Sequence, residues 1–262
     1  SKLASYGKSI MDIKSQLEEC LYFYRDELTN CFNKPLFDRF KETLNTLLLK
    51  IKDENIRICK NGKVIPEVEK YLDSLETSKN GSSSLSFALQ NISTSLDWYK
   101  VLKGADLDKN LINGLFAAQL YGPRGLIISE NFYLGLFLIT PKVFYPLHQH
   151  EALELYYICS GNLIISHGIN KDPNNFESGD FSLTPSNQIH SLKTTSKPCL
   201  LSYFWLPDGK SFPGKSWWWE KNNNGDWYRI LWKRNHDSTW EVIDKEFITK
   251  KNYRIRLFLN CF

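Results

Sequence analysis

The stretch from Tyr145 to Gly161 reads Y-P-L-H-Q-H-E-A-L-E-L-Y-Y-I-C-S-G and holds four chemically capable side chains at even positions: His148, His150, Glu154 and Tyr156. Side chains two apart on a strand share a face, so a continuous strand would project all four to one side, although a turn or bulge could break that parity. Imidazole and carboxylate together suit divalent transition metals, and two histidines with one carboxylate leave coordination positions open for a substrate. The stretch therefore predicts a catalytic metal site on a β-strand.

A second stretch downstream offers one more ligand. Residues 179–190 read G-D-F-S-L-T-P-S-N-Q-I-H, which indicates a turn into a strand, a proline-led turn out of it, and a histidine that begins the next strand. His190 would complete a site of three histidines and one glutamate. The chain has five histidines, and the other two, His167 and His236, have no such context and are expected to be structural.

The first hundred residues have helical periodicity. Apolar residues recur at three- and four-residue steps from Ile10 to Leu28 and again from Phe37 to Ile51, after Pro35. A third helix is expected after Pro66, then a Gly- and Ser-containing linker over 77–84, then a fourth helix that runs to about Tyr99. This helical lobe has no charged constellation of its own, so we expect it to support the rest of the fold and to offer a surface for a homodimer.

From about Phe116 the sequence changes to short β-rich runs separated by turn residues, which is typical of an antiparallel barrel or sandwich. The expected strands cover 133–140, 155–166, 181–184, 190–194, 200–206 and 227–232. The chain is therefore predicted to be mainly β with α: a helical N-terminal lobe over 1–112, one β-barrel over 113–240, and a C-terminal strand or tail over 241–262.

Composition excludes several classes of function. The net charge is only +4, with basic residues interrupted by acidic ones, so nucleic acid is not an expected partner. No apolar run is long enough to cross a bilayer, which predicts a cytoplasmic protein with no membrane partner. Six cysteines without a C-x-x-C pair are expected to be free thiols. Aromatic residues make up 14% of the chain; most are expected in the core, but ring faces also attract a cationic ligand.

The two histidine stretches carry a family resemblance. His148-x-His150-x-x-x-Glu154, followed by six residues and Gly161, resembles the first motif of the cupins, and Gly179-x5-Pro185-x4-His190 resembles the second, with Asn187 where many cupins have glycine. Within the cupins, the pattern that starts at Tyr145-Pro146 and includes Ala152 and Tyr156 is similar to the bacterial dimethylsulfoniopropionate lyases and their lyase-like relatives. Gly135 and Pro141 upstream fit the same group. The resemblance covers roughly residues 85 to 235.

This resemblance implies a single cupin barrel that binds one divalent metal ion, Fe(II), Mn(II) or Zn(II), through His148, His150, Glu154 and His190. The implied reaction is β-elimination of dimethylsulfoniopropionate to dimethyl sulfide and acrylate. Family members have active-site tyrosines at the positions of Tyr145 and Tyr156, and the second is commonly the proposed base. Tyr203 and Trp205, together with Phe204 and the tryptophan run over 217–219, are candidates to hold the sulfonium of this small-molecule substrate against aromatic faces.

Other interpretations of the same residues stay open at this point. Tyr145 and Tyr156 would also serve to orient metal ligands by hydrogen bonding. Arg124 and Lys193 are candidates to pair with a substrate carboxylate, although surface salt bridges explain them more simply. The ligand set also suits a cupin dioxygenase or an isomerase of a small carboxylate, and a non-catalytic cupin that senses a metal or a small molecule. Oxygen consumption would mark a dioxygenase, and ligand binding without turnover would mark a sensor.

Overall fold

The structure is a computed structural model, and it describes residues 10–31, 35–57, 64–75, 83–103, 107–209, 211–235 and 239–249. The linker predicted over 77–84 lies almost wholly outside these ranges. So do His236, Cys59, Cys261 and the tail after Thr249. The four cysteines that the structure describes, Cys20, Cys31, Cys159 and Cys199, are free thiols, as expected.

The N-terminal region is helical, as the periodicity predicted. Its elements are α1 (Ile10–Asn30), α2 (Pro35–Lys50), the 3₁₀ turn η1 (Ile51–Asp53), α3 (Pro66–Ser74) and α4 (Ser84–Ser93). The extension of the fourth helix to about Tyr99 was wrong. The Ser93 hydroxyl donates to the Gln90 carbonyl at 2.6 Å, a local bond that competes with helix continuation. Tyr99 and Lys100 then form a short strand.

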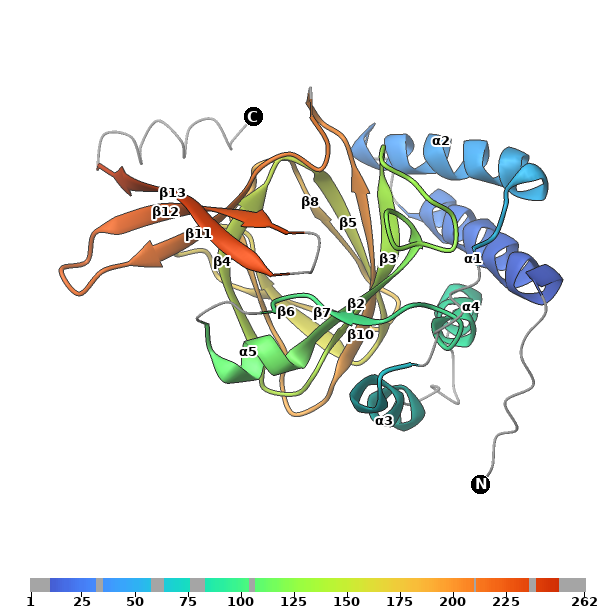
Figure 1. Cartoon of the computed structure of the whole chain (residues 1–262), viewed down its shortest axis with the longest axis horizontal. Helices are drawn as coiled ribbons and strands as arrows, with labels where there is room; N and C mark the ends of the chain where they lie inside the picture. The colour runs from blue at the N-terminus through green and yellow to red at the C-terminus, as the bar shows by residue number, and fades with distance from the viewer. Residues whose placement is uncertain are drawn as a thin grey trace.

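Two antiparallel sheets follow, and α5 (Lys109–Gly114) lies between the first two strands of the first sheet. The first sheet has six strands, in the order β1 (Tyr99–Lys100), β2 (Leu115–Tyr121), β3 (Tyr133–Ile139), β10 (Cys199–Leu206), β5 (Leu153–Ser160) and β8 (Phe181–Thr184). The second has seven, in the order β13 (Trp240–Ile248), β12 (Trp227–Arg234), β11 (Ser216–Lys221), β4 (Phe144–His150), β9 (His190–Lys193), β6 (Asn162–Ser166) and β7 (Asn174–Glu177). Together they form the predicted cupin β-barrel (Figure 1).

The single strand predicted over 155–166 is two strands, one in each sheet. Gly161 separates them with a φ of 80°, a left-handed conformation that glycine adopts without steric cost. A side chain at this position would collide with the Pro198 carbonyl. Asn187, which stands where many cupins have glycine, likewise has a positive φ of 60°, and asparagine is among the few other residues that tolerate it. The motif glycine and asparagine are therefore explained by turn geometry.

Helices α1, α2 and α4 cover the outer face of the first sheet (Figure 1). Leu155 and Tyr157 of β5 and Phe204 of β10 belong to the core shared with the helices, whereas Tyr156 of β5 and Tyr203 of β10 belong to the core inside the barrel. The buried Tyr24 hydroxyl of α1 bonds to Ser202 of β10 at 2.9 Å. The first sheet thus separates a helix-packed outer layer from an inner layer that faces the cavity.

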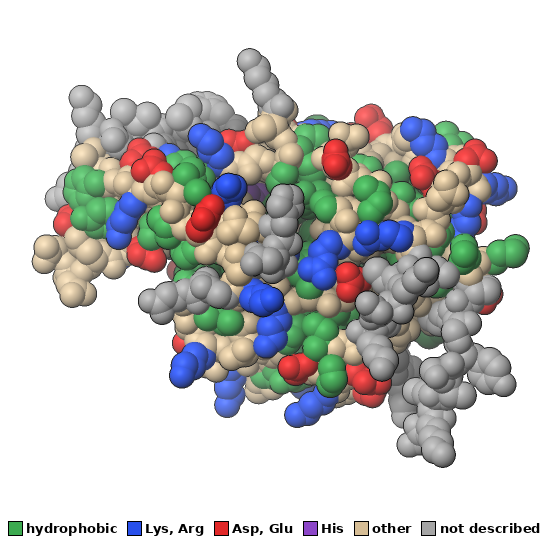
Figure 2. Space-filling model, viewed as in Figure 1, with side chains coloured by type: hydrophobic (Ala, Val, Ile, Leu, Met, Phe, Trp, Pro, Cys, Tyr) green, Lys and Arg blue, Asp and Glu red, His purple; other side chains and the backbone are tan. Residues whose placement is uncertain are grey.

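The distribution of charged side chains on the surface agrees with the small net charge of the sequence. On the face shown in Figure 2, basic side chains of the described residues are interspersed with acidic ones rather than gathered in one field. Among the described helices, none is long and apolar enough to span a membrane. The division into a lobe, a barrel and a tail, the cytoplasmic location and the homodimer stay predictions.

Candidate metal centre and its cavity

The predicted ligands come from three strands in the two sheets. His148 and His150 lie on β4, Glu154 lies on β5, and His190 begins β9. A turn at Glu151 and Ala152 does interrupt the strand, as the parity argument allowed, and it carries the chain from one sheet to the other. Because the inner faces of both sheets look into the barrel, the side chains converge despite the turn.

Pro146 sits where β4 is irregular. The pairing between β4 and β9 shifts between Tyr145 and His148, and a proline, which has no N–H to donate, is tolerated at such interruptions. Its carbonyl accepts a hydrogen bond from Nδ1 of His148 at 2.7 Å. The irregularity therefore also helps to orient a predicted ligand.

Glu154 is the centre of the cluster. Its Oε2 lies 3.3 Å from Nε2 of His150 and 3.4 Å from Nε2 of His190, and all three side chains are buried. Its other oxygen, Oε1, accepts a hydrogen bond from the Trp205 indole at 2.5 Å. Burial alone raises the pKa of Glu154, but the two histidines outweigh it and hold the pKa well below the usual range. Glu154 is thus a carboxylate inside the barrel.

All three histidines are held with the same nitrogen toward the site. Nδ1 of His150 donates to the Ala152 carbonyl at 2.9 Å, and Nδ1 of His190 donates to the Gln188 carbonyl at 2.9 Å; His148 does the same to Pro146. A carbonyl can only accept, so Nδ1 is the donor in each of these bonds, and each Nε2 is left as the ring nitrogen that would bind a ligand. Outer bonds of this kind are typical of metal-ligating histidines.

This group can hold a metal ion. The ligand atoms of His150, Glu154 and His190 lie within 4.8 Å of one another. The Nε2 of His190 is buried, lies 3.4 Å from Glu154 and makes no further hydrogen bond within the described chain, as expected of a nitrogen that serves a metal. His148 stands beside this trio, with its ring centroid 4.0 Å from that of His190. Burial and the neighbouring His190 lower the pKa of His148 well below its usual value, so it stays a neutral ligand candidate.

The two predicted tyrosines lie at the same cavity. Tyr156 is buried, and burial together with the negative charge of Glu154, to which its hydroxyl is bonded, raises its pKa well above the usual value. Tyr145 packs on the His148 ring at 4.1 Å, and burial and Glu154 raise its pKa too. Both phenols are therefore protonated unless a positive charge is added next to Glu154.

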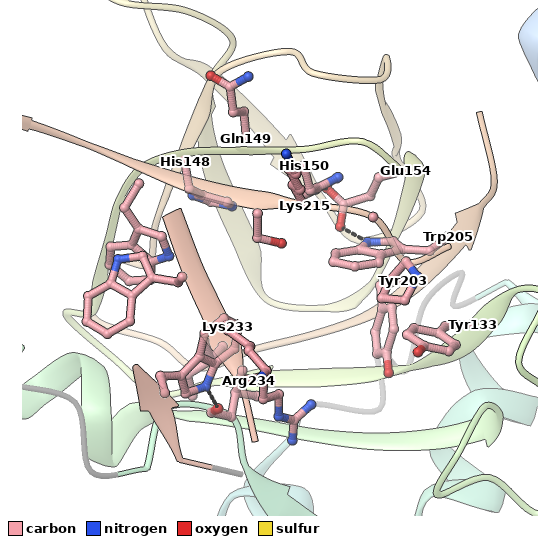
Figure 3. Close-up of a pocket in the computed structure, with 18 of the residues that line it drawn as sticks. Tyr133, His148, Gln149, His150, Glu154, Tyr203, Trp205, Lys215, Lys233 and Arg234 are labelled. Atoms are coloured by element: carbon pink, nitrogen blue, oxygen red, sulfur yellow. Dashed lines mark hydrogen bonds and ion pairs between the residues drawn. The ribbon is translucent and has the colours of Figure 1, made fainter. Parts of the chain in front are cut away.

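Tyr203 and Trp205 line the same cavity, which has a volume of about 790 Å³. Tyr203 stacks on Phe137 at 4.2 Å. Trp205 lies 4.4 Å from the His150 ring and bonds to Glu154, so it also fixes two of the predicted ligands (Figure 3). Its role as a substrate contact stays a prediction.

The sequence analysis missed a second group of cavity residues. Tyr99, Gln119 and Arg234 line the same space, and none of them lies in the two motif stretches. Arg124, a candidate partner of a substrate carboxylate for which a surface salt bridge was the simpler explanation, pairs with Asp97 at 3.2 Å and also lines the cavity. A sequence signal for these residues is lacking because they come from strands far apart in the chain that only the fold brings together.

The remaining candidates have structural surroundings. His167 bonds through Nε2 to the Thr184 hydroxyl at 3.1 Å, and burial and His190 lower its pKa to about 4. Lys193 is exposed at the end of β9. Cys159 and Cys199 are buried on β5 and β10.

Fold and site together define a class, a cupin barrel with a buried histidine and glutamate group that can hold a metal ion. A family model for dimethylsulfoniopropionate lyase matches residues 40–201, which is more than half of the chain. The chain belongs to the dimethylsulfoniopropionate lyase family. This confirms the resemblance seen in the two motifs.

Individual relatives agree with this assignment. Dimethylsulfoniopropionate lyase DddQ of Ruegeria pomeroyi is 25% identical over 119 residues, which cover 44% of this chain and 57% of the relative, little more than half its length. A structure from a study of the dimethylsulfoniopropionate lyases RdDddP and RnDddQII has a TM-score of 0.55 at 20% identity, covering 78% of this chain and 97% of that one. The structure of DddQ from Ruegeria pomeroyi has a TM-score of 0.51 at 18% identity and covers 71% and 94%. At these identities the two structures show the shared fold.

Proposed function

We propose that this chain is a metal-dependent lyase that cleaves dimethylsulfoniopropionate to dimethyl sulfide and acrylate by β-elimination. One observation carries the proposal: the buried Glu154 carboxylate is flanked by His150 and His190 and bonded to Tyr156, and His150, Glu154 and Tyr156 line one cavity. Membership in the lyase family supports the same reaction.

The metal would be held by His150, Glu154 and His190, with His148 as the fourth ligand. Imidazole and carboxylate donors suit Fe(II), Mn(II) or Zn(II). When bound, the ion would supply Lewis acidity, which stabilises negative charge on a substrate carboxylate and makes the adjacent C–H more acidic.

Tyr156 is the proposed base. Its phenolate would take a proton from the carbon next to the carboxylate, the C–H electron pair would form the new C=C bond, and the C–S pair would leave with sulfur as dimethyl sulfide. The raised pKa of Tyr156 has a clear consequence for this step. The phenolate forms at neutral pH only if positive charge is added beside Glu154. Without the metal, the Tyr156 hydroxyl should therefore stay protonated and be unable to act as the base.

The other cavity residues would position the substrate. Tyr145 lies against His148, where its hydroxyl would bond to the substrate carboxylate or assist the base. The rings of Tyr203 and Trp205 would face the sulfonium, since an aromatic face attracts a cation. The buried, largely aromatic wall would also exclude water from the reacting carbon.

The test is headspace gas chromatography of dimethyl sulfide over purified protein and dimethylsulfoniopropionate, with added Fe(II), Mn(II) or Zn(II) and under nitrogen. We expect gas well above the no-enzyme level with at least one metal, and no need for oxygen. A His150→Ala protein should release none. Absence of gas with every metal would refute the lyase proposal, and a requirement for oxygen would point to a dioxygenase instead.

A further inference from the structure

The two oxygens of the Glu154 carboxylate have different surroundings. Oε2 lies 3.3 Å from Nε2 of His150 and 3.4 Å from Nε2 of His190, so this oxygen is directed at the group that can hold a metal. Oε1 accepts a hydrogen bond from the Trp205 indole at 2.5 Å, which Figure 3 marks with a dashed line. One oxygen therefore faces the ligand group, and the other is held by a neutral donor.

The position of Trp205 follows from the strand pairing. β10 lies between β3 and β5 in the first sheet, and Trp205 is the direct partner of Tyr133 on one side and of Glu154 on the other. Directly opposite residues share a face, with Cβ atoms about 4.5–5.5 Å apart, and an indole is long enough to place its N–H on a carboxylate across that spacing. The register of the sheet therefore brings the indole to Glu154.

Neighbouring rings fix the orientation of the Trp205 indole. Its centroid lies 4.4 Å from that of His150, 6.2 Å from that of Tyr133 and 6.5 Å from that of Tyr203. The Tyr156 hydroxyl is also bonded to Glu154, but a phenol can accept as well as donate, whereas an indole N–H can only donate. Trp205 is therefore the donor to Glu154 that packing holds in a single role.

This bond bears on how Glu154 would bind an ion. A carboxylate binds a metal through one oxygen or through both, and binding through both takes up one more coordination position. A catalytic site needs an open position for its substrate. A charge-assisted hydrogen bond to Oε1 competes with any bond from that oxygen to an ion. The indole therefore favours Glu154 as a ligand through Oε2 alone.

We propose that Trp205 is a positioning residue that restricts Glu154 to ligation through one oxygen and so keeps a coordination position open for the carboxylate of the substrate. The inference rests on the proposed function only in naming the substrate carboxylate as the occupant of that position. This role depends on the N–H of Trp205 and is separate from any contact of its ring with the sulfonium. It predicts that removal of the N–H weakens the binding of a carboxylate to the metal-loaded protein.

The experiment uses Co(II)-loaded protein, whose visible absorption reports on the ligands of the ion, titrated with acetate as a simple carboxylate probe. Trp205→Phe keeps an aromatic ring and deletes the N–H. Replacement of Trp205 by benzothienylalanine, in which sulfur stands in place of the N–H, keeps the two-ring shape as well. In both variants we expect full metal content, an altered Co(II) spectrum and an acetate affinity lowered by about 10-fold to 100-fold, the effect of one charge-assisted hydrogen bond.

Trp219→Phe is the matched control. The Trp219 indole donates to Gln149 at 2.6 Å on β4, between two of the predicted histidine ligands, but Trp219 does not belong to the cavity wall. Deletion of this N–H should leave the Co(II) spectrum and the acetate affinity unchanged. The Trp205 variants are also compared in a Tyr156→Phe background, where Glu154 has lost its other donor and the fall in acetate affinity should be larger.

Equal acetate affinity in wild type and both Trp205 variants would overturn the proposal, as would an unchanged Co(II) spectrum. Loss of Co(II) from both variants would also overturn it, because the indole would then only hold the ligand group together. If Trp205→Phe does not fold, the benzothienylalanine protein decides the test. A wild type that takes up no Co(II) would refute the proposal as well.

Dimethyl sulfide release from wild type, measured with the metals named above, separates this inference from the proposed function. Release combined with equal acetate affinities refutes the role of Trp205 alone. A lowered acetate affinity in the Trp205 variants without release from wild type refutes the proposed reaction alone.

Discussion

Removing the hydroxyl of Tyr156 tests the role of the proposed base while the rest of the site stays unchanged. Tyr156→Phe keeps the ring and its packing but deletes the bond to Glu154. A hydrogen bond to a charged group contributes about 1.5–3 kcal/mol. Glu154 retains Trp205 and the two histidines, so the expected loss of unfolding free energy is in the lower part of that range, about 1.5–2 kcal/mol. For a chain of this length this corresponds to a fall in melting temperature of roughly 3–8 °C.

The effect on turnover should be far larger than the effect on stability. Loss of a general base reduces the rate by about 100-fold to 10,000-fold, with a much smaller change in substrate affinity. The assay is dimethyl sulfide release under saturating substrate, alongside elemental analysis, and metal content should be unchanged. Near-normal turnover with normal metal would refute Tyr156 as base, and loss of metal together with rate would show that it orients a ligand.

Tyr157→Phe provides the matched control. Tyr157 is the next residue on β5, but it faces the helices, where its hydroxyl bonds to Ser86 at 2.9 Å and to Ser83 of the α4 N-terminus. Its removal should cost a similar amount of stability and leave turnover intact. A large rate loss in this variant would mean that strand distortion, rather than proton transfer, explains the Tyr156 result.

Three further expectations concern the metal, the barrel wall and pH. Elemental analysis should find about one divalent metal per chain in wild type and in His167→Gln, but none in His150→Ala. Gly135→Ala should lower the free energy of unfolding by about 1–3 kcal/mol and reduce turnover, because a Cβ there would collide with the Ala118 carbonyl and lie 2.8 Å from the Tyr203 ring. Gly209→Ala is the control, since its Cβ would meet open space. Thermal melts and turnover assays should show no change in this variant. The pKa of His167 is about 4 in the folded protein and about 6.5 in the unfolded chain, so the unfolded chain takes up the proton first as the pH falls. The neutral ring therefore contributes about 1–3 kcal/mol to the free energy of unfolding above pH 6.5, and this contribution is lost as the pH falls toward 4. Denaturant titrations of metal-free protein should show that His167→Gln flattens this part of the pH dependence.

The metal centre could be predicted from sequence because its members are close together in the chain. His148, His150 and Glu154 fall within seven residues, and the punctuated hairpin before His190 marks the fourth. Strand boundaries were harder, since a run such as 155–166 shows continuous β character while one residue, Gly161, sends its two halves to different sheets. Local β propensity predicts that a strand forms, but a single residue in the left-handed conformation determines where the strand ends and which sheet the next strand joins.

Arg124 was a candidate from the sequence, but its grouping with Tyr99 and Arg234 at the cavity could not be predicted because the three residues are distant in sequence. Tyr99, Arg124 and Arg234 are brought together by the pairing of β1 with β2 and by the path of β12 along the second sheet. An arginine at a strand end has no periodicity or spacing that distinguishes it from a solvated surface residue. Only the contacts of both arginines with the Tyr99 ring reveal where they lie.

The alternation of side chains along β5 explains how one strand supports both stability and chemistry. Glu154 and Tyr156 face the cavity, while Leu155 and Tyr157 face the helices, so each reactive residue is flanked by residues that anchor the strand. Tyr157 is fixed by Ser83 and Ser86, and β10 beside it is fixed by the bond from Tyr24 to Ser202. A shift of one residue in register would exchange the two faces completely. The described helices α1 and α4 therefore contribute to the site without lining the cavity, by holding the register that keeps Glu154 and Tyr156 inside the barrel.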